Sequence, residues 1–335
     1  MVTLYHADLP AALQDRGGWA SRETAARFAD YARHMADALG DVVAHWVTHN
    51  EPWGVAFVGH AEGTKAPGVR DWPTALQVAH HLLVSHGLAV QALRASRPDA
   101  TVGITLNLAP VRAASSSDAD TQAAHRWDGH VNRWFLEPLL RGAYPDDLVA
   151  LFEQRVGPFE VRPGDPDTIA TPIDFLGINY YHPDWVRAAP AREPLGLEHI
   201  PPPPPTSPLG WQIDPQGLRD LLARLVRVYG RRPIWITENG IPDDPETPAG
   251  QGLDDHSRVD YLSTHLEALS AALADGADIR RYFVWALLDS FEWELGYGAR
   301  FGLVHVDFET QRRALKRSAR WYRGFIARAR SDEAH

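Results

Sequence analysis

Two glutamates, each at the end of a short apolar run, are the residues of this chain best suited to acid and nucleophile chemistry. Residues 46–52 read WVTHNEP and residues 235–240 read WITENG, so that Glu51 and Glu238 each follow β-branched residues and stand beside an asparagine where a turn begins. Barrel enzymes carry their chemistry at the carboxyl ends of buried parallel strands. Two carboxyl groups roughly 5–5.5 Å apart can hydrolyse a glycosidic bond through a covalent intermediate, one as acid and base and the other as nucleophile.

The elements that must position these glutamates alternate along the chain. Short apolar segments alternate with longer amphipathic ones, which is the pattern of a parallel α/β fold. The predicted strands are Val2–Tyr5, Val42–Thr48, Thr101–Leu106, Ile173–Tyr180, Pro233–Thr237 and Arg281–Leu287. The predicted helices are Ser21–Leu39 with Ser21 as N-cap, Thr74–Ala95, Gln216–Tyr229, His256–Ala274 and Ser318–Ala329. Residues 113–120 and 192–208 are predicted loops, the second with an exposed run of five prolines, Pro201–Pro205.

Six strands with intervening helices fit two folds. A doubly wound open sheet needs a glycine-rich phosphate turn after its first strand, and the sequence has none. A (β/α)₈ barrel places chemistry where Glu51 and Glu238 fall, although it needs eight strands. The positions of the two glutamates favour the barrel, and residues 1–335 are expected to form one barrel domain.

The composition argues against several other classes of protein. The net charge of −10 argues against nucleic-acid binding, and no apolar stretch is long enough for a membrane span. The start of the chain lacks the layout of a signal peptide, and the absence of cysteine excludes thiolate metal sites, so a cytoplasmic location is expected. No metal or cofactor is predicted, because histidines 80, 81 and 86 are not spaced to place two ligands on one helix face. We expect packing or surface roles for His80, His81, His86, His125 and His130.

Around the two glutamates the chain resembles the family-1 glycoside hydrolases, the β-glucosidases and their relatives. Residues 48–53 (THNEPW) are similar to the family's acid/base strand and residues 236–240 (ITENG) to its nucleophile strand. Residues 174–181 (DFLGINYY) and 285–293 (WALLDSFEW), the latter followed by RFGL at 300–303, are similar to its sixth and eighth strands. The matches occur in order over nearly the whole chain. The resemblance implies a TIM-type α/β barrel, a small-molecule β-glycoside as substrate and no cofactor.

The resemblance also implies a role for each matching residue. Glu51 would be the general acid/base and Glu238 the nucleophile. Asn50 would bind the sugar 2-hydroxyl, Tyr181 would hold the nucleophile, and Asn179 would line the same site. The residues implied to bind substrate are His6, Trp53, Trp285, Glu292, Trp293 and Phe301, with Trp285 under the sugar and Trp53 facing the aglycone.

The first predicted strand resembles the family's strand three, so the barrel is expected to be incomplete, with six of eight β/α units, strands three to eight. In the family, strands one and two carry a Gln that binds the sugar and an Arg that pairs with the nucleophile. Ala7 also stands where the family usually has Trp. Strands three and eight would then be unpaired edges, and we expect a homo-oligomer that covers them.

The function expected from the resemblance is a retaining exo-β-glycosidase, similar to a β-glucosidase, that hydrolyses small β-glucosides through a covalent glycosyl-enzyme intermediate. Two alternatives are a catalytically impaired or inactive sugar-binding relic, and one part of a split enzyme that needs the missing N-terminal units.

Overall fold

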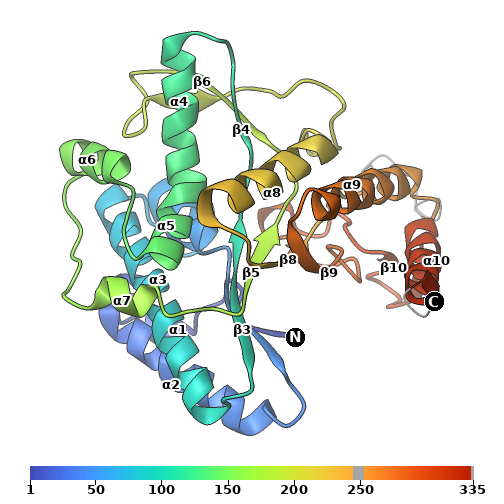
Figure 1. Cartoon of the computed structure of the whole chain (residues 1–335), viewed down its shortest axis with the longest axis horizontal. Helices are drawn as coiled ribbons and strands as arrows, with labels where there is room; N and C mark the ends of the chain where they lie inside the picture. Colours follow the sequence, from blue (N-terminus) through green and yellow to red (C-terminus); the bar gives the residue numbers. More distant parts are fainter. Residues whose placement is uncertain (244–252, 333–335) are drawn as a thin grey trace.

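A six-stranded parallel sheet forms the centre of the molecule in the computed structural model, which describes residues 1–243 and 253–332 (Figure 1). Each neighbouring pair of its strands is parallel. In order across the sheet, the strands are β1 (Val2–Tyr5), β2 (His45–Asn50), β3 (Thr101–Asn107), β5 (Phe175–Asn179), β8 (Pro233–Glu238) and β9 (Asp278–Tyr282). Each of the six predicted strands overlaps one of these.

Helices connect the strands. The long ones are α2 (Arg22–Leu39), α3 (Trp72–Ser96), α8 (Pro215–Tyr229), α9 (His256–Ala274) and α10 (Arg317–Asp332). The shorter ones are α1 (Ala11–Gln14), α4 (Asp118–Asp128), α5 (Trp134–Arg141), α6 (Asp146–Arg155) and α7 (Asp165–Ile169). Two 3₁₀ turns, η1 (Gly18–Ala20) and η4 (Trp293–Leu295), and two π-helical segments, η2 (Gly54–Glu62) and η3 (Gly129–Arg133), complete the set. Within the described ranges, no helix has the length and apolar character needed to cross a membrane.

Two small sheets lie outside the main one, and the sequence did not indicate them. One contains β4 (Val111–Ala113), β6 (Asp184–Ala188) and β7 (Leu197–His199), and the other pairs β10 (Val304–Val306) with β11 (Arg313–Leu315). The predicted loop 192–208 was therefore wrong at β7, which pairs antiparallel with β6. The proline run within that segment is largely exposed, as predicted.

Two other predicted boundaries were wrong for local reasons, and one predicted capping bond is absent. The predicted loop 113–120 ends earlier, because α4 begins at Asp118 after Ser117, whose hydroxyl oxygen accepts the Asp120 N–H at 3.2 Å. Ser21 precedes α2 as predicted but makes no side-chain capping bond. The last strand spans 278–282 rather than 281–287, because a half-exposed end strand carries polar residues that an apolar pattern does not detect.

The sheet is curved like the wall of a barrel. Its outer side chains join the main apolar core with the helices, and Val47, Phe175 and Trp235 form a separate cluster on the other face. His45 at the start of β2 and Arg281 in β9 are four strand positions apart, which in a flat sheet would separate them by roughly 19 Å. Their ring and guanidinium nitrogens lie only 3.0 Å apart. Only strong curvature brings these two side chains together.

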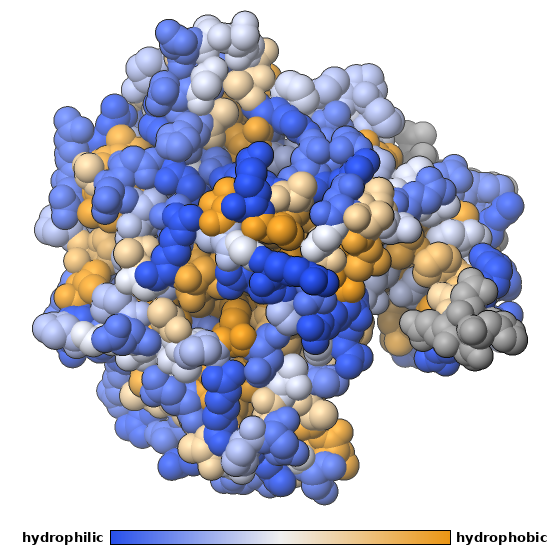
Figure 2. Space-filling model, in the orientation of Figure 1, coloured by the Kyte–Doolittle hydropathy of each residue, from blue (hydrophilic) through white to orange (hydrophobic). Residues whose placement is uncertain are grey.

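The sheet has two ends, β1 and β9. Among the residues that the structure describes, no further strand pairs beyond either of them. The outline of the molecule is notched between the part built by α2 and the lobe built by α9 and α10 (Figures 1 and 2). Several large apolar side chains on segments after β9 are exposed, including Leu287 at 68% and Phe291 at 57%.

Candidate active site

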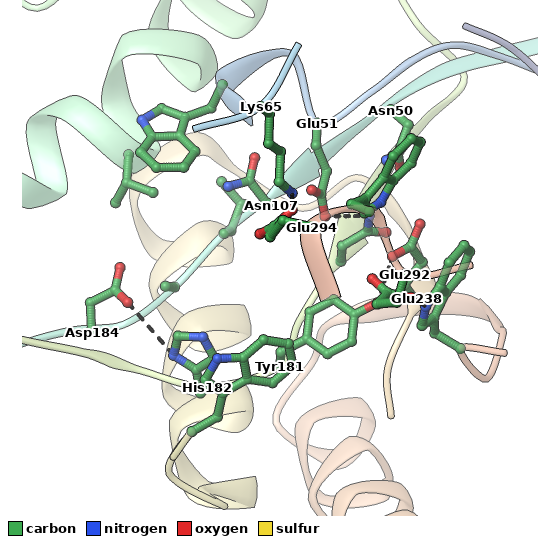
Figure 3. Close-up of a pocket in the computed structure, with 18 of the residues that line it drawn as sticks. Asn50, Glu51, Lys65, Asn107, Tyr181, His182, Asp184, Glu238, Glu292 and Glu294 are labelled. Carbon is green, nitrogen blue, oxygen red and sulfur yellow. Dashed lines mark hydrogen bonds and ion pairs between the residues drawn. The ribbon is translucent and has the colours of Figure 1, made fainter. Parts of the chain in front are cut away.

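An open cleft of about 370 Å³ lies at the carboxyl ends of the strands (Figure 3). Four neighbouring strands each contribute their last residue to its lining: Asn50 from β2, Asn107 from β3, Asn179 from β5 and Glu238 from β8. Glu51 follows directly after β2. The structure therefore brings the two predicted carboxylates into one cavity, at the edge of the sheet where barrel enzymes carry their chemistry.

Glu51 is held by both its backbone and its side chain. Its N–H bonds Thr105 O at 3.0 Å, and the chain then turns into η2 with Glu51 at φ +45°, a conformation that a non-glycine residue adopts only where its surroundings impose it. The Asn179 amide donates to Glu51 Oε1 at 2.8 Å and to Asn50 Oδ1 at 3.0 Å. Thr237 donates to Asn179 Oδ1 at 2.7 Å, which points the Asn179 NH₂ group toward the carboxylate.

Glu238 is held by Tyr181, whose hydroxyl donates to Oε2 at 2.6 Å. Burial raises the pKa of the Tyr181 phenol well above its usual range, so the phenol stays protonated and remains a donor. The turn after β8 is fixed by Asn239, which donates to Tyr261 at 2.9 Å and accepts from the Tyr282 hydroxyl at 2.8 Å. The side-chain contact predicted for Tyr181 is thus present in the structure.

The electrostatics of the pair follow from burial. Burial raises the pKa of Glu51, and burial together with the charge on Glu51 raises the pKa of Glu238 well above its usual range. The Tyr181 hydrogen bond acts in the opposite direction on Glu238 and favours its ionised form. Two neighbouring carboxyl groups of raised pKa hold a shared proton at higher pH than isolated glutamates would. The Tyr181 bond favours the ionised form of Glu238, and the Asn179 bond acts in the same way on Glu51.

A second wall of the cleft comes from segments after β1 and β9. The His6 ring stacks against Trp285 and Trp293, each at 5.7 Å between ring centres. Trp285 Nε1 donates to Glu292 Oε2 at 3.4 Å, and burial raises the pKa of the Glu292 carboxyl. Phe301 also lines the cleft, and its ring centre lies 6.3 Å from that of Tyr181 and 6.0 Å from that of Trp211. All of these predicted substrate-binding residues therefore line the same cavity as the carboxylates.

The opposite side of the cleft holds Trp53 and several residues that sequence reasoning missed. Trp53 packs edge-on against Trp127 at 5.8 Å between ring centres. The polar and aromatic lining residues that were missed are Glu62, Lys65, Asn107, Trp127, His182, Asp184, His199, Trp211 and, on the loop of the second wall, Glu294. Many of them lie on segments for which no helix or strand was predicted. An aromatic residue isolated in a polar segment, such as Trp127 or Trp211, was the one sequence feature that could have indicated a lining residue there.

The histidines for which packing or surface roles were predicted lie in such positions, His81 among the buried ones. On α3, His80 bonds Asp165 at 2.9 Å and His86 bonds Thr48 at 2.7 Å, and both rings are fully buried. His130 is buried among aromatic rings, whereas His125 is exposed. In the described part of the chain, no group of three or more His, Asp or Glu side chains is arranged to hold a metal ion.

A curved parallel α/β sheet with two carboxyl groups in one cavity at its strand ends is the arrangement expected of a TIM-barrel glycoside hydrolase. Glycosyl hydrolase family 1 matches residues 1–331. The chain is 40% identical to β-glucosidase A of Acetivibrio thermocellus over 97% of this chain and 73% of that protein. It superposes on the GH1 β-glucosidase of Exiguobacterium antarcticum B7 with a TM-score of 0.95 at 40% identity, covering 98% of this chain and 74% of the other.

A β-glucosidase of Thermotoga maritima in complex with deoxynojirimycin gives a TM-score of 0.91 at 37% identity, covering 98% of this chain and 73% of the other. The chain belongs to glycosyl hydrolase family 1, and it is a retaining β-glycosidase. The predicted family and barrel-type α/β fold are confirmed.

Proposed function

We propose that this chain hydrolyses small, neutral β-glucosides from their non-reducing end, with Glu238 as nucleophile and Glu51 as acid/base. The observation that carries this proposal is the hydrogen bonding of the pair: Tyr181 donates to Glu238, and Asn179 donates to Glu51. Six carboxylates line the cleft, so an anionic sugar would be repelled there.

The proposed reaction has two steps. Glu238 attacks the anomeric carbon while the bond to the aglycone breaks, and Glu51 gives its proton to the departing oxygen. In the second step Glu51 takes a proton from water, and the water oxygen displaces Glu238 from the anomeric carbon. Two displacements at one carbon retain its configuration.

The sugar's place in the cleft follows from the second wall. We assign the outer hydroxyls to His6, Glu292 and Trp293, the face of the ring to Trp285, and the neighbourhood of the nucleophile to Phe301. Asn50 would bind the 2-hydroxyl, since its amide lies beside both Glu51 and the His6 ring. Trp53 would then contact the aglycone.

The experiment that tests this proposal is hydrolysis of an aryl β-glucoside by the purified chain, with the first-formed sugar anomer read by NMR. We expect the β-anomer. Glu238→Ala should lose on the order of 10⁴-fold or more in turnover, because the covalent step is removed. Azide should restore turnover and give the α-glycosyl azide. The α-anomer as first product, or no rescue by azide, would contradict the assignment.

We further propose that the six strands correspond to strands three to eight of the family barrel and that the chain forms a homo-oligomer covering β1 and β9. Two observations support this: within residues 1–243 and 253–332 no strand pairs with the outer sides of β1 and β9, and Leu287 and Phe291 are exposed. Light scattering at working concentration should give a mass of at least two chains. A monodisperse single chain would contradict the oligomer, and activity that appears only after adding a separate N-terminal segment would identify a split enzyme.

A further inference from the structure

The loop that carries Glu292 and Trp293 is held to the rest of the protein mainly by side chains. Each backbone hydrogen bond that the structure describes for residues 292–298 joins two residues of this same loop, for example Glu292 N–H to Gly296 O at 2.7 Å. Trp293 has φ +46°, a left-handed conformation that costs energy in a non-glycine residue. Side-chain contacts from outside the loop add to its internal bonds: the His6 ring stacks on Trp293 at 5.7 Å between ring centres, and Trp285 Nε1 donates to Glu292 Oε2 at 3.4 Å.

Lys65 reaches this loop from the opposite side of the cleft. Its ammonium group lies 3.8 Å from Glu294 Oε2 and 6.0 Å from the centre of the Trp293 ring. In Figure 3 the Lys65 side chain points into the cleft, with Glu51 and Glu294 near its end. One side chain thus contacts the loop at two neighbouring residues, and one of them is a proposed sugar ligand.

The backbone around Lys65 is firmly anchored, unlike the loop that it contacts. Thr64 N–H bonds Val58 O at 3.2 Å and Val69 N–H bonds Gly59 O at 3.1 Å, both to η2, which begins at Gly54, shortly after Glu51. The Lys65 carbonyl accepts the Gly68 N–H at 2.8 Å. Lys65 therefore extends from the segment fixed by the acid/base strand to the segment that bears the sugar wall.

The charge of Lys65 has no equivalent in the lining of the cleft. Among the described residues that line it, six are carboxylates, and Lys65 is the one lysine or arginine. Its charge lowers the pKa of Glu51, Glu62 and Glu292, each against the larger effect of burial. Without Lys65, no lysine or arginine among the described lining residues would offset the repulsion between the carboxylates of Glu292 and Glu294 and the other carboxylates of the cleft.

We propose that Lys65 is a positioning residue that holds the 292–298 loop over the sugar site through its contacts with Glu294 and the Trp293 ring. This rests on the proposed function, because the loop matters only if Glu292 and Trp293 bind the sugar. It adds a residue, outside the four segments that carry the family resemblance, on which sugar affinity depends.

The size of the expected effect follows from exposure. The Lys65 and Glu294 side chains are 39% and 52% exposed, and exposed ion pairs of this kind change an equilibrium by a few-fold at most. The free energy of unfolding should hardly change in Lys65→Met. We expect KM for an aryl β-glucoside to rise about two- to five-fold in Lys65→Met, with kcat changed less, because the loop binds the sugar and does not react.

The experiment compares Lys65→Met, Glu294→Gln, their double variant and the charge-exchanged pair Lys65→Glu/Glu294→Lys. The double variant should be no worse than the worse single variant, and the exchanged pair should recover most of the lost affinity. The matched control is Arg219→Gln, which breaks another exposed ion pair, to Asp275 at 2.7 Å, on α8 outside the cleft. It should leave KM unchanged.

Deoxynojirimycin affinity, measured by calorimetry on the same proteins, separates this proposal from the proposed function. If the wild-type chain does not hydrolyse the substrate but Lys65→Met weakens the inhibitor and the exchanged pair restores it, only the proposed function fails. If hydrolysis occurs and Lys65→Met and Glu294→Gln match wild type in KM and inhibitor affinity, the positioning role is overturned. Additive losses in the double variant, or absence of both hydrolysis and inhibitor binding, also overturn it.

Discussion

The two sides of the cleft are built in different ways. Glu51 and Glu238 stand at the ends of strands β2 and β8, inside a continuous ladder of parallel pairs, and Asn179 of β5 lies between them. Glu292 and Trp293 lie beyond the end strand β9, on a loop whose described backbone bonds are internal. The proposed reacting groups are thus fixed by the sheet, and the proposed sugar ligands by side-chain contacts.

This difference in construction predicts which kinetic constant, kcat or KM, each side of the cleft controls. Catalysis requires reacting groups within a fraction of an ångström of their productive positions, which rigid strands supply. Sugar recognition tolerates small adjustments, so a loop suffices. Substitutions on the strand side should therefore act on kcat, and substitutions on the loop side should act on KM.

Glu51→Ala should produce the largest loss among the variants that distinguish the two sides. General acid catalysis contributes about 10²- to 10⁴-fold, and it matters most when the leaving group is poor. We expect a loss of that size in kcat/KM for alkyl β-glucosides and a much smaller one for a dinitrophenyl glucoside. The exposed Glu267→Ala on α9 is the control. Equal losses on both substrates would argue against Glu51 as the acid.

Glu292→Gln tests the loop side. Loss of a charged hydrogen-bond partner typically costs about 1.5–3 kcal/mol, which corresponds to roughly 10- to 100-fold in affinity. The loss should appear in KM for the aryl glucoside, measured by steady-state kinetics, with a smaller change in kcat. A loss confined to kcat would contradict the prediction that substitutions on the loop side act on KM.

Tyr181→Phe removes the 2.6 Å hydrogen bond to Glu238 while keeping the ring. Because the bond favours the ionised nucleophile, its loss raises the pKa of Glu238 further. We expect kcat/KM at neutral pH to fall about 10-fold and the acid limb of its pH profile to move to higher pH. A uniform loss at all pH values would indicate a structural role instead.

The pH profile of the wild-type chain gives the subtlest test. Activity should fall at low pH when Glu238 becomes protonated and at high pH when Glu51 loses its proton. Both limbs should lie above the pH expected for isolated glutamates, because both pKa values are raised. In Glu51→Gln the group that loses its proton on the alkaline limb is gone, so that limb should vanish. The acid limb should hardly move, because Glu51 is already protonated and uncharged at that pH. A persisting alkaline limb would contradict the assignment of that limb to Glu51.

From the sequence, the two candidate catalytic glutamates could be predicted more accurately than the bounds of the helices and strands around them. Glu51 and Glu238 could be found because buried strands are apolar and a carboxylate after them is conspicuous. The end strand β9 was misplaced because its half-exposed residues, such as Arg280 and Arg281, carry no apolar pattern.

The helices between β3 and β5 were missed for a different reason. Segments such as α4 are short and carry a weak apolar pattern, and α4 packs on β6, which lies more than fifty residues further along the chain. The same holds for Lys65, whose partner Glu294 is far along the chain and could not be paired with it from the sequence.

The stacking of His6 on Trp285 and Trp293 has a thermodynamic consequence. His6 follows β1 and the two tryptophans follow β9, so these rings join the two ends of a six-stranded sheet. A sugar bound among them contacts both ends at once and acts as a reversible cross-link. Folding and ligand occupancy are then linked by mass action, and a ligand at a hundred times its Kd would stabilise the native state by about 2.7 kcal/mol.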